Sequence, residues 1–136
     1  MVDWLVAEDY KVIEVSKEKS DLNNLAEIKD KSLPSVMNYL HHAEFYIGLS
    51  SGISWLAWAV RKKVFMIANF STKEHEFQTD CIRITDESVC HGCWNVYDFN
   101  PGDWNWCPVN KGTKQQFECS KSITGQDVIK EIDKLI

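Results

Sequence analysis

Apolar residues occur along the chain in short runs, and the composition and spacing of these runs predict strands that alternate with helices. Runs rich in β-branched or aromatic residues predict strands at residues 12–15, 45–49, 64–68 and 81–84. A helix is expected to end within residues 1–10, and further helices are expected at residues 34–42, 53–61 and 122–136. This order is typical of a Rossmann-like parallel sheet with crossover helices, so we predict an α/β fold.

The helical patterns also predict which side chains are buried. Thr124 and Asp127 form a capping-box-like start for the last helix, whose apolar stripe consists of Val128, Ile129, Ile132, Leu135 and Ile136. Trp55 and Trp58 fall within the apolar helix at residues 53–61, and we expect both to lie in the core.

Length and charge narrow the class of protein. The chain has 136 residues, enough for one domain, and a net charge of −5 that argues against a nucleic-acid-binding surface. The N-terminus lacks the basic region and apolar run of a signal peptide, and no apolar stretch approaches the ~20 residues of a membrane-spanning helix. We therefore expect a soluble cytoplasmic protein.

The cysteine-rich segment, residues 86–121, has no hydrophobic period. Two residues separate Cys90 from Cys93, 13 separate Cys93 from Cys107, and 11 separate Cys107 from Cys119. A CxxC pair followed by two further cysteines is a ligand set suited to structural zinc or to a one-iron thiolate centre. A redox CxxC pair and buried free thiols are the competing interpretations. Tryptophans are expected to shield the thiolates: Trp94, Trp104 and Trp106.

Two loops are candidates for binding a nucleotide. In the SSG loop (residues 50–52), Ser50, Ser51 and Gly52 lie between a predicted buried strand and a helix start, where small residues and unpaired amides suit phosphate. A tight turn without a ligand fits the same pattern. In the SKE loop (residues 16–18), which also contains Ser16, Lys17 could meet a phosphate and Glu18 a ribose hydroxyl. A solvated charged loop is the alternative there.

The motifs together resemble one family. The run FYIGLSSGISWLAWAVRKKVFMIANFSTKEHEF, followed by CHGCWN, DWNWCP and FECSKSIT, is similar to the autotransporter heptosyltransferases of Gram-negative bacteria. The resemblance implies a GT-B glycosyltransferase that transfers heptose from ADP-heptose to serine hydroxyls of autotransporter adhesins in the cytoplasm. It also implies that the SSG loop holds the donor diphosphate and that residues 16–18 form the first nucleotide loop.

The same resemblance assigns the cysteines to a four-cysteine finger associated with one iron ion and with homo-oligomer assembly, which favours iron over zinc. The related lipopolysaccharide enzymes carry an acidic residue and a threonine before the glycine, and a histidine three residues after it. The corresponding residues in this chain are Ser50, Ser51 and Trp55. Contacts that depend on the carboxylate or the imidazole are therefore not carried over.

The resemblance covers only the C-terminal, nucleotide-sugar-binding half of a GT-B fold. We divide the chain into a Rossmann-like part (residues 1–85), a metal finger (residues 86–121) and a C-terminal helix (residues 122–136). The family's catalytic base belongs to an acceptor domain, so we expect no catalytic residue here and no activity of the isolated chain. The alternative hypothesis is a non-catalytic, metal-stabilised interaction module with a vestigial nucleotide-sugar site.

Overall fold

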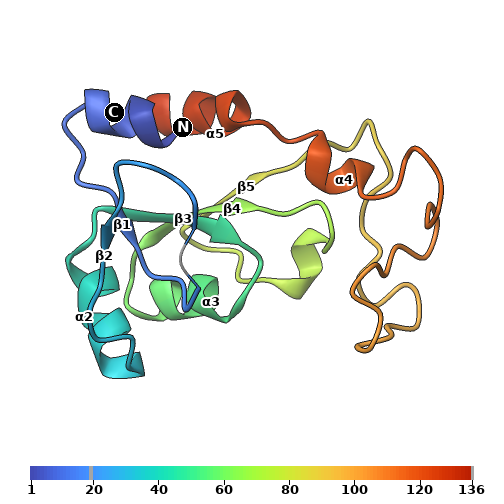
Figure 1. Ribbon diagram of the computed structural model, residues 1–136, viewed down its shortest axis with the longest axis horizontal. Helices are drawn as coiled ribbons and strands as arrows, with labels where there is room; N and C mark the ends of the chain where they lie inside the picture. Colours follow the sequence, from blue (N-terminus) through green and yellow to red (C-terminus); the bar gives the residue numbers. More distant parts are fainter. Residues whose placement is uncertain (19, 136) are drawn as a thin grey trace.

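The computed structural model describes residues 1–18 and 20–135, and its centre is a parallel sheet (Figure 1). Strands β3 (Phe45–Leu49), β4 (Lys63–Ile67) and β5 (Cys81–Ile84) are hydrogen-bonded in the order β3-β4-β5. Leu49 pairs with Ile67 and Ile67 with Ile84, so the three carboxyl ends meet at one edge. Two shorter strands, β1 (Ile13–Glu14) and β2 (Ala26–Glu27), form a second parallel pair. The predicted α/β class with parallel strands is confirmed.

Strand β4 occupies the middle of the sheet and is covered on both faces. Val64, Phe65 and Met66 are completely buried, as expected for a continuous apolar run in a parallel strand. Because side chains alternate across a strand, Val64 and Met66 enter one core cluster while Phe65 enters another. The sheet therefore has helices on each side.

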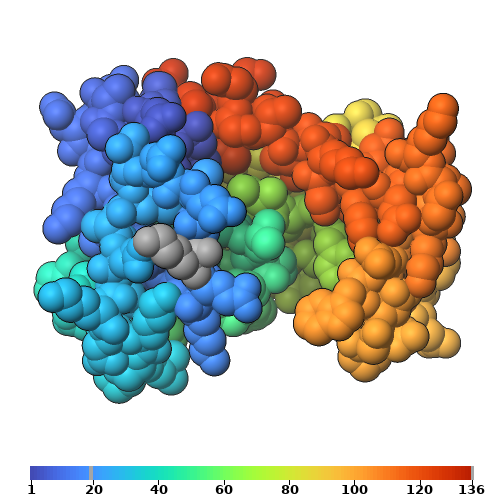
Figure 2. All heavy atoms as spheres, viewed as in Figure 1, coloured from blue at the N-terminus to red at the C-terminus, as the bar shows by residue number. Residues whose placement is uncertain are grey.

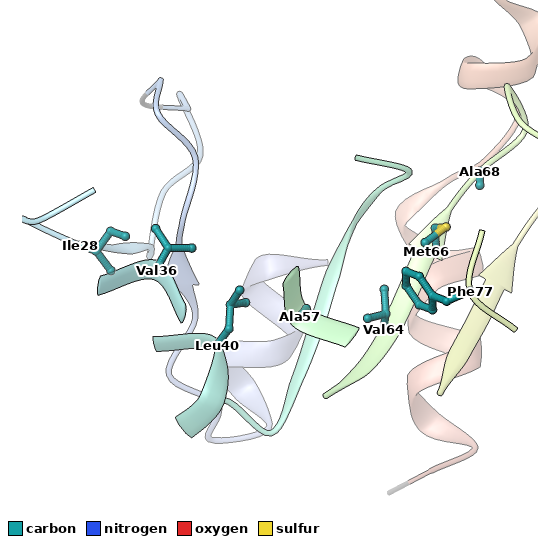
Figure 3. Close-up of a cluster of buried hydrophobic side chains, with 8 residues drawn as sticks. All are labelled: Ile28, Val36, Leu40, Ala57, Val64, Met66, Ala68 and Phe77. Atoms are coloured by element: carbon teal, nitrogen blue, oxygen red, sulfur yellow. The ribbon is translucent and has the colours of Figure 1, made fainter. Parts of the chain in front are cut away.

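On the first face, α3 (Gly52–Ala59) packs against β3 and β4, and α2 (Leu33–His42) packs against α3. Figure 3 shows the shared core, which extends from Ile28 and Val36 to Phe77. Val36 and Leu40 are buried, which accounts for the apolar spacing in α2. Trp55 was expected in this core, but 43% of its surface is exposed. Its ring instead packs edge-on against Trp58 and Phe77 at the margin of the cluster.

On the second face, α1 (Val2–Ala7) lies beside α5 (Gly125–Asp133) (Figure 1). Leu5 from α1 and Val128 and Ile132 from α5 bury Phe65 between them. The capping box predicted at Thr124 and Asp127 is confirmed, because each side chain bonds the other residue's backbone N–H. Of the predicted stripe, Leu135 is exposed and Ile136 lies outside the described residues.

The cysteine-rich segment projects from the carboxyl edge of the sheet and consists mainly of turns (Figure 1). Its one helix is α4 (Glu118–Lys121), a single turn that the sequence pattern did not predict. A short 3-10 turn, η1 (Lys73–His75), follows β4. Within residues 1–18 and 20–135, no helix combines the length and the apolar character needed to cross a bilayer.

Candidate functional site

The SSG loop joins β3 directly to α3. Strand β3 ends at Leu49 and the helix begins at Gly52, with Ser51 as an extended N-cap residue. Among the described residues, the side chain of Ser51 makes no hydrogen bond to the first amides of the helix. These N–H groups have no partner within the helix either, and the helix dipole makes their environment positive. The turn therefore presents donors suited to an anion.

Tyr46 and Ser54 lie beneath this loop. Ser54 is fully buried, and its hydroxyl donates a hydrogen bond to the carbonyl of Leu49, the last residue of β3. Burial raises the pKa of Tyr46, while hydrogen bonds with the Ser54 and Ser51 side chains act in the opposite direction. The Ser51 side chain is therefore close enough to Tyr46 to affect its pKa, and it does not cap the helix.

The ring of Tyr46 needs the glycine two residues along the same strand. A Cβ at Gly48 would collide with the ring and hydroxyl of Tyr46, so only glycine lets the ring fold over the backbone. Tyr46 was not among the predicted site residues, although a glycine inside an apolar strand is the signal of such a close approach.

Gly52 has a different environment. A Cβ built on this residue meets nothing within 4 Å, so the backbone at the helix start is open to an approaching group. Ser50, Ser51 and Gly52 are all exposed. Figure 2 shows the molecule hollowed between the blue-to-cyan N-terminal part and the orange cysteine-rich segment, with teal and green atoms on the floor of the hollow.

The SKE loop follows β1 and is anchored elsewhere. The ammonium of Lys31, just before α2, donates to the carbonyl of Lys17 at 2.8 Å. Lys17 and Glu18 are exposed, and Ser16 is half-buried. In the described part of the chain, no hydrogen bond or ion pair joins this loop to the SSG loop, so their shared role stays a prediction.

The four cysteines of the cysteine-rich segment differ in their burial. Cys93 and Cys107 are buried, and Cys90 and Cys119 are half-buried. Burial is the largest cause that raises the pKa of the Cys93 thiol to about 11. Cys90 adds charge repulsion and a hydrogen bond, and Cys119 and Cys107 add further charge repulsion. Even so, residues 1–18 and 20–135 contain no group of three or more His, Cys, Asp or Glu side chains arranged to hold an ion.

Cys81 lies apart from this group. It is in β5, half-buried against the core, and burial raises the pKa of its thiol. This position agrees with its sequence context, which is an apolar strand.

An aromatic cluster connects the cysteine-rich segment to the sheet. Phe70, which follows β4, contacts the rings of Trp94 and Trp106 with centroids 5.4 and 5.6 Å apart. Phe99 contacts the same two tryptophans at 5.2 Å. Trp104 does not shield the thiols as expected, since 95% of its surface is exposed. The rings that pack together in this segment are those of two tryptophans and two phenylalanines.

Asn69, also after β4, makes the polar connections. Its carbonyl accepts from Gly92 N–H at 2.7 Å. Its side-chain Nδ2 donates to the carbonyls of Asp86 and Cys119, each at 3.0 Å, and its Oδ1 accepts from Asp86 N–H at 2.8 Å. The side chain is buried, and it had not been identified from the sequence. The cysteine-rich segment is thereby attached to the same sheet edge that carries the SSG loop.

Comparison with known proteins identifies relatives of this arrangement, although no family model matches the chain. The autotransporter heptosyltransferase Aah of Escherichia coli is 49% identical over 94 residues, which are 68% of this chain and 24% of Aah. The inactive autotransporter heptosyltransferase BimC of Burkholderia thailandensis is 30% identical over 140 aligned positions, covering 95% of this chain and 33% of BimC. The chain thus spans about a quarter to a third of these curated relatives.

Solved structures agree with the sequence relatives. The iron-containing dodecameric glycosyltransferase TibC from enterotoxigenic E. coli superposes with a TM-score of 0.84 at 35% identity, over 98% of this chain and 38% of TibC. The complex of TibC with ADP-D-β-D-heptose superposes with a TM-score of 0.82. Over the part that aligns, the chain is a homologue of the autotransporter heptosyltransferases and has the α/β fold of TibC.

Proposed function

We propose that the chain is the donor-binding part of a glycosyltransferase that uses ADP-heptose to glycosylate serines of autotransporter adhesins in the bacterial cytoplasm. The observation that carries this proposal is the SSG loop, where an uncapped helix start and a bare Gly52 face open space at the carboxyl edge of a parallel sheet. The TibC complex with ADP-D-β-D-heptose supports the choice of donor.

In this proposal, the diphosphate oxygens accept hydrogen bonds from the first amides of α3, whose dipole favours the negative charge. Ser51, the N-cap residue of α3, leaves these amides without a side-chain partner and would offer its own hydroxyl to the phosphate. Lys17 would neutralise part of the phosphate charge and Glu18 would accept from a ribose hydroxyl. No residue of this chain is assigned a catalytic role, and the acceptor serine would bind to a part of the enzyme with its own base.

We further propose that Cys90, Cys93, Cys107 and Cys119 hold one iron ion, with zinc as the alternative. Four soft thiol donors fit either metal, and a cation would offset the charge repulsion that the other three cysteines exert on Cys93. A bound ion would cross-link a segment that has few buried apolar residues. The iron-containing, dodecameric TibC supports iron and assembly into a homo-oligomer.

Binding, rather than turnover, is the property to test first, because a relative that aligns with 95% of this chain is itself named inactive. Calorimetry with ADP and with ADP-heptose is expected to detect binding to the wild-type chain. Absence of heat at millimolar ligand would reject the donor site and leave the non-catalytic module.

A pair of glycine variants locates the binding site. Gly52 and Gly125 are the first residues of α3 and α5, and a side chain fits at both. Gly52→Asp and Gly125→Asp are expected to fold normally, because a carboxylate near a helix start is favourable. Only Gly52→Asp is expected to weaken ADP binding, by roughly tenfold or more. Its carboxylate would occupy the diphosphate site and repel the negatively charged phosphates. Equal affinities for the two variants would exclude the SSG loop as the site.

A further inference from the structure

The cysteine-rich segment is closed at both ends by one side chain. Asp86 is at its beginning and Cys119 near its end, yet the amide of Asn69 bonds the backbone of both. The hydrogen-bonding capacity of this buried amide is well used, since both N–H groups donate and the oxygen accepts. Asn69 therefore brings the last cysteine back toward the place where the segment leaves the sheet.

Closing such a long loop costs conformational entropy, and few apolar contacts offset it here. Cys93 and Cys107 are buried in the segment, but most of its other side chains are exposed. Backbone hydrogen bonds from Gly92 to Asn69 and from Trp94 to Phe70 add a third point of attachment beside Cys93. Residues 69 and 70 are thus the site at which Cys93 and Cys119 are placed relative to each other.

The loop that carries Asn69 is also bound by Arg83, a residue of β5. The guanidinium of Arg83 donates to the carbonyls of Ala68 at 3.1 Å and Ser71 at 3.0 Å. Arg83 also forms an ion pair with the buried carboxylate of Glu76, which accepts from the hydroxyl of Ser71. We call the contacts of Asn69 with Asp86 and Cys119 the clamp. Through Arg83, the loop that carries this clamp is attached to β5.

We propose that Asn69 is a positioning residue that closes the cysteine-rich segment, so that Cys119 joins Cys90, Cys93 and Cys107 around one metal ion. The role deepens the proposed metal site and rests on it, since Asn69 acts through the backbone of Cys119 rather than on the metal. Residues that orient metal ligands without contacting the metal themselves change metal affinity by about 10- to 100-fold.

Asn69→Asp is the sharpest variant, because it keeps the size and the acceptor oxygen but removes both N–H donors. The full chain, loaded with one equivalent of zinc, is transferred into excess chelator and the release of zinc is followed over time. Asn69→Asp is expected to release zinc at least about tenfold faster than wild type. Amide hydrogen exchange of the metal-free chain is expected to rise around Gly92 and Cys119.

Two controls separate positioning from a loss of stability or a change of charge. Ile132→Val lowers stability in the core between α5 and the sheet, outside the segment. Asn38→Asp makes the same chemical change on the exposed surface of α2. Both are expected to release zinc at the wild-type rate. If Asn69→Asp does not fold, Asn69→Ser, which is uncharged and too short to reach both carbonyls, is expected to speed release as well.

The outcomes distinguish this inference from the metal proposal. If the wild-type chain takes up no zinc or iron, the metal site fails, and faster amide exchange in Asn69→Asp alone would still support the clamp. If the wild-type chain binds metal and Asn69→Asp changes neither zinc release nor amide exchange, the clamp is wrong.

Discussion

The sheet and the cysteine-rich segment acquire their order from different interactions. Around β4, order comes from apolar burial: Val64, Phe65 and Met66 are fully enclosed between two layers of helices. In the cysteine-rich segment, order comes from polar attachments to Asn69 and Phe70 and from a small aromatic cluster at Phe70, while many apolar side chains remain at the surface. These exposed side chains include Val96, Tyr97, Phe99, Trp104 and Val109.

Because of this difference, we expect different kinds of substitution to destabilise each region. Loss of one core side chain creates a cavity that the surrounding helices cannot fill, so the sheet should be sensitive to volume. The cysteine-rich segment has little core to lose, so it should be sensitive to backbone conformation and to its attachments. The exposed aromatic side chains of this segment are the ones that the proposed homo-oligomer would cover.

The largest effect is expected from the centre of the sheet. Phe65→Ala should lower the free energy of unfolding by about 3–5 kcal/mol, because a fully buried ring is removed from the contact between β4 and α5. Urea unfolding followed by circular dichroism measures the change. Trp104→Ala is the matched control, and it should change stability by no more than about 0.5 kcal/mol because the indole is exposed. If the two variants lost similar amounts of unfolding free energy, the proposed difference between the sheet and the cysteine-rich segment would be wrong.

A smaller effect is expected from the backbone of the cysteine-rich segment. Gly92 has a φ of +70°, and a Cβ there would lie 3.0 Å from the methyl carbon of Thr72. Gly92→Ala should therefore destabilise by about 1–3 kcal/mol. Gly112 has a φ of +78° but open space around it, so Gly112→Ala should cost only about 1 kcal/mol. The same unfolding assay compares them, and equal losses would show that the Thr72 contact is unimportant.

The smallest effect is expected at the start of α5. Thr124→Ala removes one half of the capping box and should cost about 1 kcal/mol at neutral pH. Hydrogen bonds from the Thr124 side chain and backbone lower the pKa of Asp127 below its ordinary value of 3.8. Because the folded pKa is the lower one, this stabilisation is complete above the unfolded pKa and disappears as pH falls through the folded pKa.

The difference in stability between wild type and Thr124→Ala should therefore shrink when unfolding is measured at progressively lower pH. A difference that stays constant well below pH 3.8 would mean that the Asp127 carboxylate contributes nothing to the cap.

Much of the sheet could be predicted because its signals are local. The apolar run of β4 and the Thr124 cap are each encoded within a few neighbouring residues, and both are confirmed. Strand β2 was missed because two residues form no recognisable run. Trp55 was misassigned because the helix is apolar on almost every side, so its pattern does not indicate which residue faces the margin.

The candidate sites show the same division. The cysteine spacing indicated a thiol cluster, and the small residues indicated an open turn at Gly52, because both depend on residues close in the sequence. The contacts of Asn69 reach residues 17 and 50 positions away, so no local pattern could reveal them.

By itself, the sequence determined the alternation of strands and helices, the cap of the last helix and the choice of residues able to bind phosphate or a soft metal. Burial periodicity and residue chemistry are local properties, so they can be read from the sequence before the fold is known. Only the tertiary structure decided that the SSG loop and the cysteine-rich segment share one edge of the molecule. That result follows from the parallel register of Leu49 with Ile67, which places Ser51 and Asn69 two residues beyond paired strand ends.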